Sequence, residues 1–135
     1  MTDTLRLEVV TPSRRVLEVR ASEVRVPGAL GELGILPGHT PLLTSLGTGE
    51  LKWIEGSEAG RLVVQGGFAE IQPDAVTVLA SVAETADQID LELAVQAHAE
   101  ATERLKTAPA EDFDELDAAL RLAEARKLIA AGGGP

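Results

Sequence analysis

The residues with the clearest potential for chemistry lie in one short segment, GELGILPGHTPLL, at 31–43. This segment holds His39, one of only two histidines of the chain, among glycines and prolines that shape tight turns. A histidine in such a setting is a candidate for a general base, for a metal ligand, or for part of a rigid recognition loop. The function of the protein depends on which of these roles His39 has.

A catalytic role and a metal-binding role both need further side chains that the sequence does not supply. A catalytic histidine needs a carboxylate or a nucleophile in a defined cleft, and near His39 there are only Glu32 and Thr40, without a catalytic motif. The other histidine, His98, falls in a different part of the chain, and there is no cysteine. We therefore predict no catalytic residue and no metal site, and favour a recognition loop, with a purely structural turn as the alternative.

The composition argues against several classes of partner. The net charge of −10 would repel nucleic acid and anionic lipid surfaces, and an aromatic content of 2% is too low for base-stacking platforms. No apolar run approaches the roughly 20 residues of a membrane span. The start, MTDTLRLEVV, lacks the basic and apolar regions of a signal peptide. We expect a soluble protein of a reducing compartment, with no nucleic-acid partner and no direct insertion into lipid.

The first 86 residues have the pattern of a small all-β domain. Apolar and polar side chains alternate in short runs, as in LRLEV at 5–9, which is the two-residue period of half-buried strands. Glycine and proline fall between the runs, where turns are needed. About eight to ten strands at this spacing predict an antiparallel β-sandwich, or flattened barrel, over residues 1–86.

Residues 87–135 have a helical pattern instead. The run after Asp90 is rich in Ala, Leu and Glu, and Asp90 is a suitable N-cap with Ile89 before it as a hydrophobic staple. Pro109 interrupts this run, and a second helical run ends at the glycines 132–134. The predicted fold class is therefore α+β, a sandwich followed by an antiparallel two-helix hairpin.

The hairpin is expected to dock weakly. Alanine fills much of both helical runs, and at about 25 cal/mol per Å² of buried apolar surface an alanine-rich face gains far less than a leucine-rich one. Isolated helices of this length are also marginal in water. Two alternatives follow: a hairpin that can leave the sandwich for another docking site, or a hairpin that is permanently packed on it.

Two segments resemble a known family. GELGILPGHTPLL at 31–43 and GGFAEIQPDAVTVLAS at 66–81 are similar to the epsilon subunit of bacterial F-type ATP synthases, which corresponds to delta in mitochondria. The similarity runs through residues 4–86 and continues less closely through the hairpin. It implies a non-catalytic subunit of the rotary central stalk that couples gamma to the c-ring in proton-driven ATP synthesis. It also implies a peripheral location at the cytoplasmic face of the bacterial inner membrane.

The resemblance implies interface residues as well. In this family the loop around His39 is an interface, and proline rigidity lowers the entropy lost when such a loop docks. Leu42 and Leu43 have a second interpretation, because the strands of the sandwich core also need leucine. Two groups of positions match the family's contacts: with the c-ring, Ala29 and Glu32, and with gamma, His39, Thr40, Leu42 and Leu43.

One family motif is incomplete in this chain. Some bacterial members bind ATP through Ile or Leu, Asp, two variable residues, Arg and Ala at the start of the first C-terminal helix. Ile89, Asp90 and Ala94 match, but the arginine position holds Leu93, which cannot pair with a phosphate. Glu100, where a further arginine can occur, would repel the ligand. We expect ATP binding to be weak or absent, and no other cofactor.

The helical hairpin carries a further implied role. In relatives it extends along gamma into the catalytic alpha/beta head and blocks ATP hydrolysis, partly through basic residues of the second helix. The candidates here are Arg121, Arg126 and Lys127, which at 100° per residue form no common stripe and alternate with acidic residues. Charge-driven inhibition is therefore a weaker hypothesis here than for a typical member, and the sequence leaves open whether the hairpin inhibits at all.

An alternative function is a free-standing β-sandwich binding module with a helical appendage. Such modules commonly hold small ligands or carbohydrates on aromatic platforms. Trp53, Phe68 and Phe113 are too few and too scattered to form one. The sequence therefore favours the stalk subunit.

Overall fold

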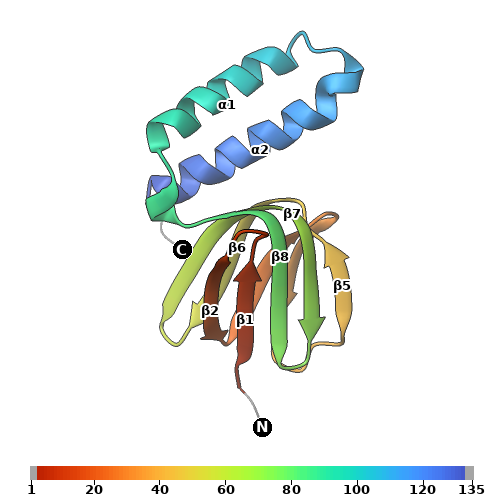
Figure 1. Cartoon of the computed structure of the whole chain (residues 1–135), viewed down its shortest axis with the longest axis vertical. Coiled ribbons are helices and arrows are strands. Elements are labelled where there is room, and N and C mark those ends of the chain that lie inside the picture. Colours follow the sequence, from red (N-terminus) through yellow and green to blue (C-terminus); the bar gives the residue numbers. More distant parts are fainter. Residues whose placement is uncertain (1–2, 133–135) are drawn as a thin grey trace.

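Residues 3–132 are described by the computed structural model, which shows a β-sandwich with two helices above one end (Figure 1). This confirms the predicted α+β fold, in which a sandwich precedes a helical hairpin. In chain order the elements are β1 (Leu5–Val10), β2 (Arg15–Ala21), β3 (Glu23–Gly28), β4 (Gly31–Ile35), β5 (Leu42–Ser45), β6 (Thr48–Glu55), β7 (Glu58–Gln72), β8 (Ala75–Glu84), η1 (Ala86–Gln88), α1 (Leu91–Leu105), η2 (Ala110–Asp112) and α2 (Phe113–Ala130).

The pairing of the strands is antiparallel with one exception. The strand order is β2-β1-β8-β7-β6-β3-β4, and β5 pairs with β7 beside this path. Strands β1 and β8 run parallel, from Arg6 opposite Ala75 to Val10 opposite Leu79. This pair differs from the predicted antiparallel sandwich, because alternation of side chains has the same two-residue period in both directions and cannot distinguish them.

The core of the sandwich is aliphatic, and the alternation in the sequence locates it correctly. Leu5, Leu7 and Val9 are fully buried, whereas Arg6 between them is exposed. Each fully buried side chain of this size contributes about 1.5–3 kcal/mol relative to an exposed one. The largest fully buried side chains in the described residues are all Leu, Ile or Val.

Strand β7 bends sharply at two glycines. Gly66 and Gly67 have φ angles of 68° and 97°, a region that L side chains avoid. Opposite them, Leu46 and Gly47 separate β5 from β6. The ladder continues across this gap, because the Leu46 amide donates to the Gly67 carbonyl at 2.9 Å and the Gly66 amide to the Gly47 carbonyl at 3.1 Å. The first half of β7 therefore pairs with β6 and the second half with β5.

The bend changes which side chains of β7 face outward. Leu62 and Val64 belong to the sandwich core before the glycines, and Ala69 and Ile71 belong to it after them. Inward positions thus change from even to odd numbers within one strand. As a result, Val63 points outward before the bend, although it is fully buried.

The buried outward side chain of Val63 marks the docking site of the hairpin. It packs against Ala125 and Ile129 of α2, with Ile89 and Leu122 beside them. Figure 1 shows α2 between α1 and the sandwich, so α1 is held mainly through α2. The sandwich therefore carries the hairpin on the outer face of β6 and β7.

The ends of the helices follow the predicted signals. The Asp90 side chain accepts a hydrogen bond from the Leu93 amide at 3.2 Å, which confirms Asp90 as the N-cap of α1. Gly132 after α2 has a φ of 71°, the left-handed conformation that ends helices. Gly133 and Gly134 of the predicted stop, like residues 1–2 of the start, lie outside the described residues. None of the described helices is long and apolar enough to cross a membrane.

Replacing Gly67 by alanine should strongly destabilise the fold. A Cβ at Gly67 would collide with the Leu79 carbonyl oxygen at a positive φ, so Gly67→Ala should lower the free energy of unfolding by roughly 3 kcal/mol or more. Urea unfolding followed by the fluorescence of Trp53 measures this change. In the control Gly34→Ala the new Cβ meets no atom within 4 Å, and we expect a change within about 1 kcal/mol. Equal stabilities of the two variants would contradict this account of the bend.

Candidate functional site

The segment around His39 forms a turn that is fixed through its backbone. Gly38 adopts a φ of 89°, and its amide donates to the Pro73 carbonyl at 2.7 Å. The His39 amide donates to the Leu36 carbonyl at 3.2 Å, which closes the turn. The loop at 36–41 is thereby tied to the turn between β7 and β8. A loop held in this way loses little conformational freedom on docking.

The imidazole of His39 is engaged by the adjacent backbone. Its Nδ1 lies 2.6 Å from the Thr40 carbonyl oxygen, and because a carbonyl can only accept, Nδ1 carries the proton. The other histidine, His98, lies on α1, where its Nε2 is 3.6 Å from Glu124 of α2. Within residues 3–132, no group of three or more metal-ligating side chains comes together. His39 thus lies in a loop that is held through its backbone, and its imidazole binds within that loop.

Leu42 and Leu43 lie on β5 and are not part of the sandwich core. Their exposed fractions are 42% and 67%. Their alternative interpretation as core residues is therefore wrong. The physical reason is that β5 is a short strand at the side of β7, where one face and one edge meet solvent.

An apolar strip runs from β5 across the neighbouring strands. Phe68 of β7 lies opposite Leu79 of β8, and the two side chains are 53% and 52% exposed. Leu43 lies opposite Glu70, the next outward position after Phe68 along β7. We call Leu43, Phe68 and Leu79 the outer apolar strip. Monomeric proteins seldom leave such side chains together on a sheet face without a partner.

The strip has a hollow at each end. One of about 300 Å³ lies beside Pro41 and Leu43, where the strip meets the loop that carries His39. The other, of about 330 Å³, lies beside Val10 and Leu79 on the β1 side. Pro41 of the loop and Leu43 of the strip line the first hollow, and Leu79 of the strip lines the second; the docking site of the hairpin, at Val63, lies on the other side of the bend in β7.

Phe68 and Leu79 are absent from the predicted interface residues. In FAEIQ at 68–72, Phe68 lies on the same face of the strand as the polar Glu70 and Gln72. A phenylalanine that alternates with polar residues in this way indicates an exposed aromatic side chain. The signal is clear only once the two glycines before Phe68 are known to reset the alternation. A pattern continued through Gly66 and Gly67 would place Phe68 in the core.

The turn that carries Ala29 and the loop that carries His39 lie at opposite ends of β4. Ala29 is exposed in the turn before β4, next to Leu30, whose side chain is fully exposed. Glu32 is the second residue of the strand, and His39 follows its far end. The Ala29 amide, however, donates to the Ser45 carbonyl of β5 at 2.9 Å, so the c-ring group lies beside the end of the strand that carries Leu42 and Leu43, and away from His39.

Glu32 belongs to a network of ion pairs on the outer face of β3, β6 and β7. Arg25, Lys52 and Arg61 lie directly opposite one another on the three strands. Like charges in such positions repel unless anions separate them. Each cation has a carboxylate partner: Arg25 pairs with Glu23 (2.7 Å), Lys52 with Glu32 (3.2 Å) and Arg61 with Glu50 (3.4 Å).

The pKa of Glu32 is lowered from its ordinary value. Partial desolvation, the largest single effect, raises this pKa, but the hydrogen bonds and charges of Lys52 and Arg25 together outweigh it. The carboxylate is exposed enough for solvent screening to keep the energy small. Glu32 is thus a charged group whose two cations are already in place.

The residues that match the ATP motif surround a hollow of about 310 Å³ at the start of α1, and they are Ile89, Asp90 and Ala94. Asp90 is occupied as the helix cap, and Leu93 stands where a phosphate would need a cation. Arg126 also lines the hollow, but it donates two hydrogen bonds to Glu84. Two carboxylates and one engaged arginine do not fit a triphosphate.

The three basic residues of α2 do not form a common surface. Arg121 pairs with Asp117 one turn earlier, at 2.9 Å. Arg126 faces the sandwich and binds Glu84 at 2.7 Å. Lys127 is half-buried. The different directions of these side chains agree with the helical geometry that the sequence predicts.

Comparisons with known proteins identify the family. A family model described as ATP synthase, Delta/Epsilon chain, beta-sandwich domain matches residues 4–86. The ATP synthase epsilon chain 2 of Syntrophotalea carbinolica is 43% identical over 99% of this chain and 99% of its own length. This chain belongs to the ATP synthase epsilon chain family. The epsilon chain of Solibacter usitatus is 46% identical over 93% of this chain and 95% of its own. As an epsilon-family member, the chain is a non-catalytic subunit.

Two solved assemblies contain chains with the same fold as this epsilon-family chain. One is the Euglena gracilis mitochondrial ATP synthase, OSCP/F1/c-ring, with a TM-score of 0.80 and 24% identity over 97% of this chain and 82% of that chain. The other is the central stalk/c-ring of the Tetrahymena thermophila mitochondrial ATP synthase, with a TM-score of 0.62 and 14% identity over 91% and 96%. At these identities the likeness is one of fold, and it extends over both sandwich and hairpin.

Removing the positive charge of Lys52 should raise the pKa of Glu32. In Lys52→Gln one of the two cations that lower this pKa is lost, so the carboxyl should titrate closer to its ordinary value. Because the folded pKa is lowered, Glu32 adds stability above its unfolded pKa of about 4.3, and this contribution is lost as pH falls through the folded value. The variant should therefore lose less stability on acidification.

The chemical shift of the Glu32 carboxyl carbon, followed across an acid titration, gives the pKa of Glu32 in the unchanged chain and in Lys52→Gln. Lys106→Gln is the control, since Lys106 pairs with Glu103 on α1 and leaves Glu32 untouched. An unchanged titration of Glu32 in Lys52→Gln would show that the ion pair has no influence in solution.

Proposed function

We propose that this epsilon-family chain is a central-stalk subunit that couples gamma to the c-ring during proton-driven ATP synthesis. Two features support the proposal: the family membership, and the fold shared with chains of assemblies that contain a c-ring. In this role it is a peripheral component at the cytoplasmic face of the bacterial inner membrane. The observation that carries the proposal is the outer apolar strip beside a rigid loop.

The partner that we assign to the strip is gamma. His39, Thr40, Leu42 and Leu43 match the gamma contacts of the family, and the strip continues from them across the sheet. Apolar side chains at the centre of an interface with polar groups around them are typical of stable association. Strands β7 and β8 beneath the strip are hydrogen-bonded on both sides, and β5 is hydrogen-bonded to β7, so the surface is formed before gamma binds.

The c-ring contact that we propose uses the turn between β3 and β4. Ala29 and Leu30 form its exposed tip, and Glu32 follows on β4 with its charge held by Lys52 and Arg25. This turn and the His39 loop lie at opposite ends of β4, and the turn is joined to the end of β5 through the Ala29 amide and the Ser45 carbonyl.

For the hairpin we propose a docked, non-inhibitory position and a released position that reaches the catalytic alpha/beta head. When docked, Arg126 binds Glu84 and Arg121 binds Asp117, so two of the three predicted head contacts are engaged within the chain. Inhibition of ATP hydrolysis then requires release of the hairpin. This role rests on the family resemblance and on the small docking area.

Replacing Phe68 by aspartate should abolish stable association with gamma. The substitution places a charge at the centre of the strip, and loss of such a contact costs at least about 2 kcal/mol, or about 30-fold in affinity. Size-exclusion chromatography and calorimetry with the gamma subunit from the same organism measure this, and the unchanged chain should give a one-to-one complex. The control is Ile54→Asp, an exposed apolar position on β6 outside the strip.

The outcome separates the stalk subunit from a free-standing binding module. Binding of Phe68→Asp with unchanged affinity would remove the strip from the interface. Failure of the unchanged chain to bind gamma at all would contradict the proposed function.

ATP should not bind to this chain at micromolar concentrations. The hollow at the start of α1 offers no free cation among its lining residues, and Leu93 cannot replace the missing one. Isothermal titration of the full chain with ATP and magnesium is expected to give no heat beyond dilution. A saturable signal with a micromolar dissociation constant would show that the motif has an alternative set of phosphate contacts.

A further inference from the structure

The apolar contact between hairpin and sandwich is small. On the sandwich side its buried centre is Val63, and on the hairpin side it is Ala125 and Ile129. Three buried side chains make up its centre, and one of them is an alanine, which removes little apolar area from water. Most of the hairpin, including α1, extends beyond it (Figure 1).

Within residues 3–132, a two-pronged ion pair joins the same two parts. The Nε of Arg126 donates to Oε1 of Glu84 at 2.7 Å, and a terminal nitrogen of Arg126 donates to Oε2 at 2.9 Å. The side chains are 31% and 25% exposed, so the pair is partly withdrawn from water. Two parallel hydrogen bonds between a guanidinium and a carboxylate are stronger and more directional than an ordinary surface ion pair.

The pair joins the end of the sandwich to the last third of α2. Glu84 is the last residue of β8, directly before the hinge at 85–90, and Arg126 lies in the last third of α2. The two residues are 42 positions apart, so the pair closes the whole hairpin back onto the end of the sandwich. A hydrogen bond from Gln65 to the Ala118 carbonyl is longer, at 3.4 Å.

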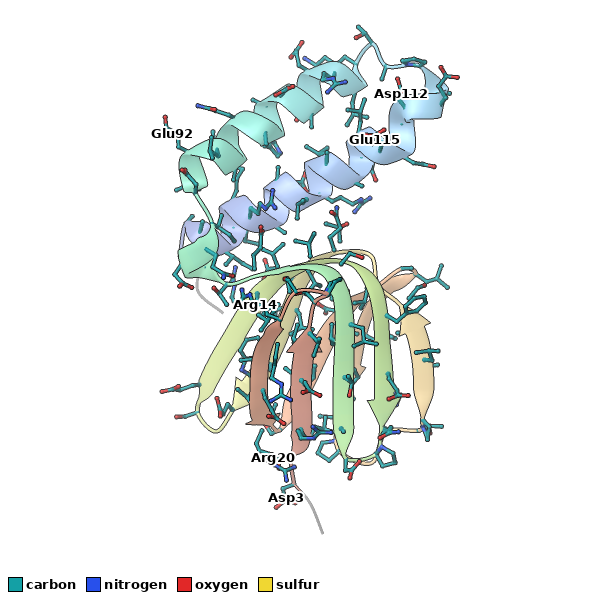
Figure 2. The ribbon with its side chains drawn as sticks, in the orientation of Figure 1. Asp3, Arg14, Arg20, Glu92, Asp112 and Glu115 are labelled. Carbon is teal, nitrogen blue, oxygen red and sulfur yellow. The ribbon has the colours of Figure 1, made fainter. Side chains whose placement is uncertain are left out.

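Among the described residues, several other charged side chains form no ion pair between sandwich and hairpin. Arg14 lies at the end of the sandwich that faces the hairpin, while Glu92 lies at the start of α1 and Asp112 and Glu115 lie at the far end of the hairpin (Figure 2). The pKa of Asp87 in the hinge is lowered, mainly by the Thr85 hydroxyl and least by the charge of Arg14. Asp87 is fully exposed, so this attraction is screened by solvent.

We propose that the Glu84–Arg126 pair is a latch that sets how much of the hairpin is docked. Arg126 can bind Glu84 or an acidic surface of another subunit, but not both, so release of the hairpin and exposure of its cation are one event. The identity of that second partner rests on the proposed function. The latch itself is a property of the isolated chain and is tested without other subunits.

Breaking the pair should increase the undocked fraction by roughly tenfold, the value of about one charged hydrogen bond. The chain has no cysteine, so Ser81→Cys on β8 and Asp112→Cys at the far end of the hairpin give two unique sites for spin labels. Pulsed electron paramagnetic resonance then measures the distribution of distances between the label on the sandwich and the label on the hairpin. Arg126→Gln and Glu84→Gln should each add a longer distance at the expense of the docked one.

The matched control is Arg121→Gln in the same doubly labelled chain. It removes the same charge from the same helix but breaks only the pair with Asp117 within α2. Its distance distribution should equal that of the unchanged chain. The exchange variant Glu84→Arg with Arg126→Glu should recover the docked distance, because opposite charges face each other again.

Two results would overturn the latch. One is a docked distance that persists unchanged in both single variants, and the other is equal opening in Arg121→Gln. The fluorescence of Trp53 and the circular dichroism of each variant report whether the sandwich and the helices are folded. If one of the single variants does not fold, the exchange variant still tests the ion pair. All latch variants should still bind gamma, so a failed latch and a failed stalk function give different results.

Discussion

The backbone conformation of Gly66 and Gly67 determines the outer surfaces of this molecule. Positive φ angles at both residues let β7 bend and shift its alternation by one position. Before the shift the outward side chain is Val63, which the hairpin covers. After the shift it is Phe68, which lies at the centre of the outer apolar strip. The hairpin and the proposed gamma contact are thus placed on different parts of one strand by two residues without side chains.

Local patterns in the sequence predicted a large part of the fold. Alternation located buried residues such as Leu5 and Leu7, and the cap signal located the start of α1 at Asp90. These features depend on a few neighbouring residues, which is why they can be read from a single sequence. The parallel pairing of β1 with β8 could not be predicted, since the period of side chains carries no direction.

The candidate site was predictable only in part, for a similar reason. The rigid loop around His39 follows from glycine and proline in its own segment. Phe68 and Leu79 required knowledge of the phase change at the bend. The pair of Glu84 and Arg126 joins residues far apart in the chain, and each alone is indistinguishable from the many other charged residues of an acidic protein. Long-range contacts of this kind follow from the packed fold and not from a local pattern.

The parallel pairing of β1 and β8 has a mechanical consequence. The chain enters the sandwich at the end away from the helices and leaves β8 at the end beside them (Figure 1). A pull on the hairpin along β8 is therefore opposed by the whole row of hydrogen bonds to β1 and β7 in shear, and these bonds share the load. The contact of α2 with the sandwich lacks such a row and yields first. The order of rupture under tension is built into the direction of one strand pair: the hairpin can be torn away while the sandwich keeps its shape.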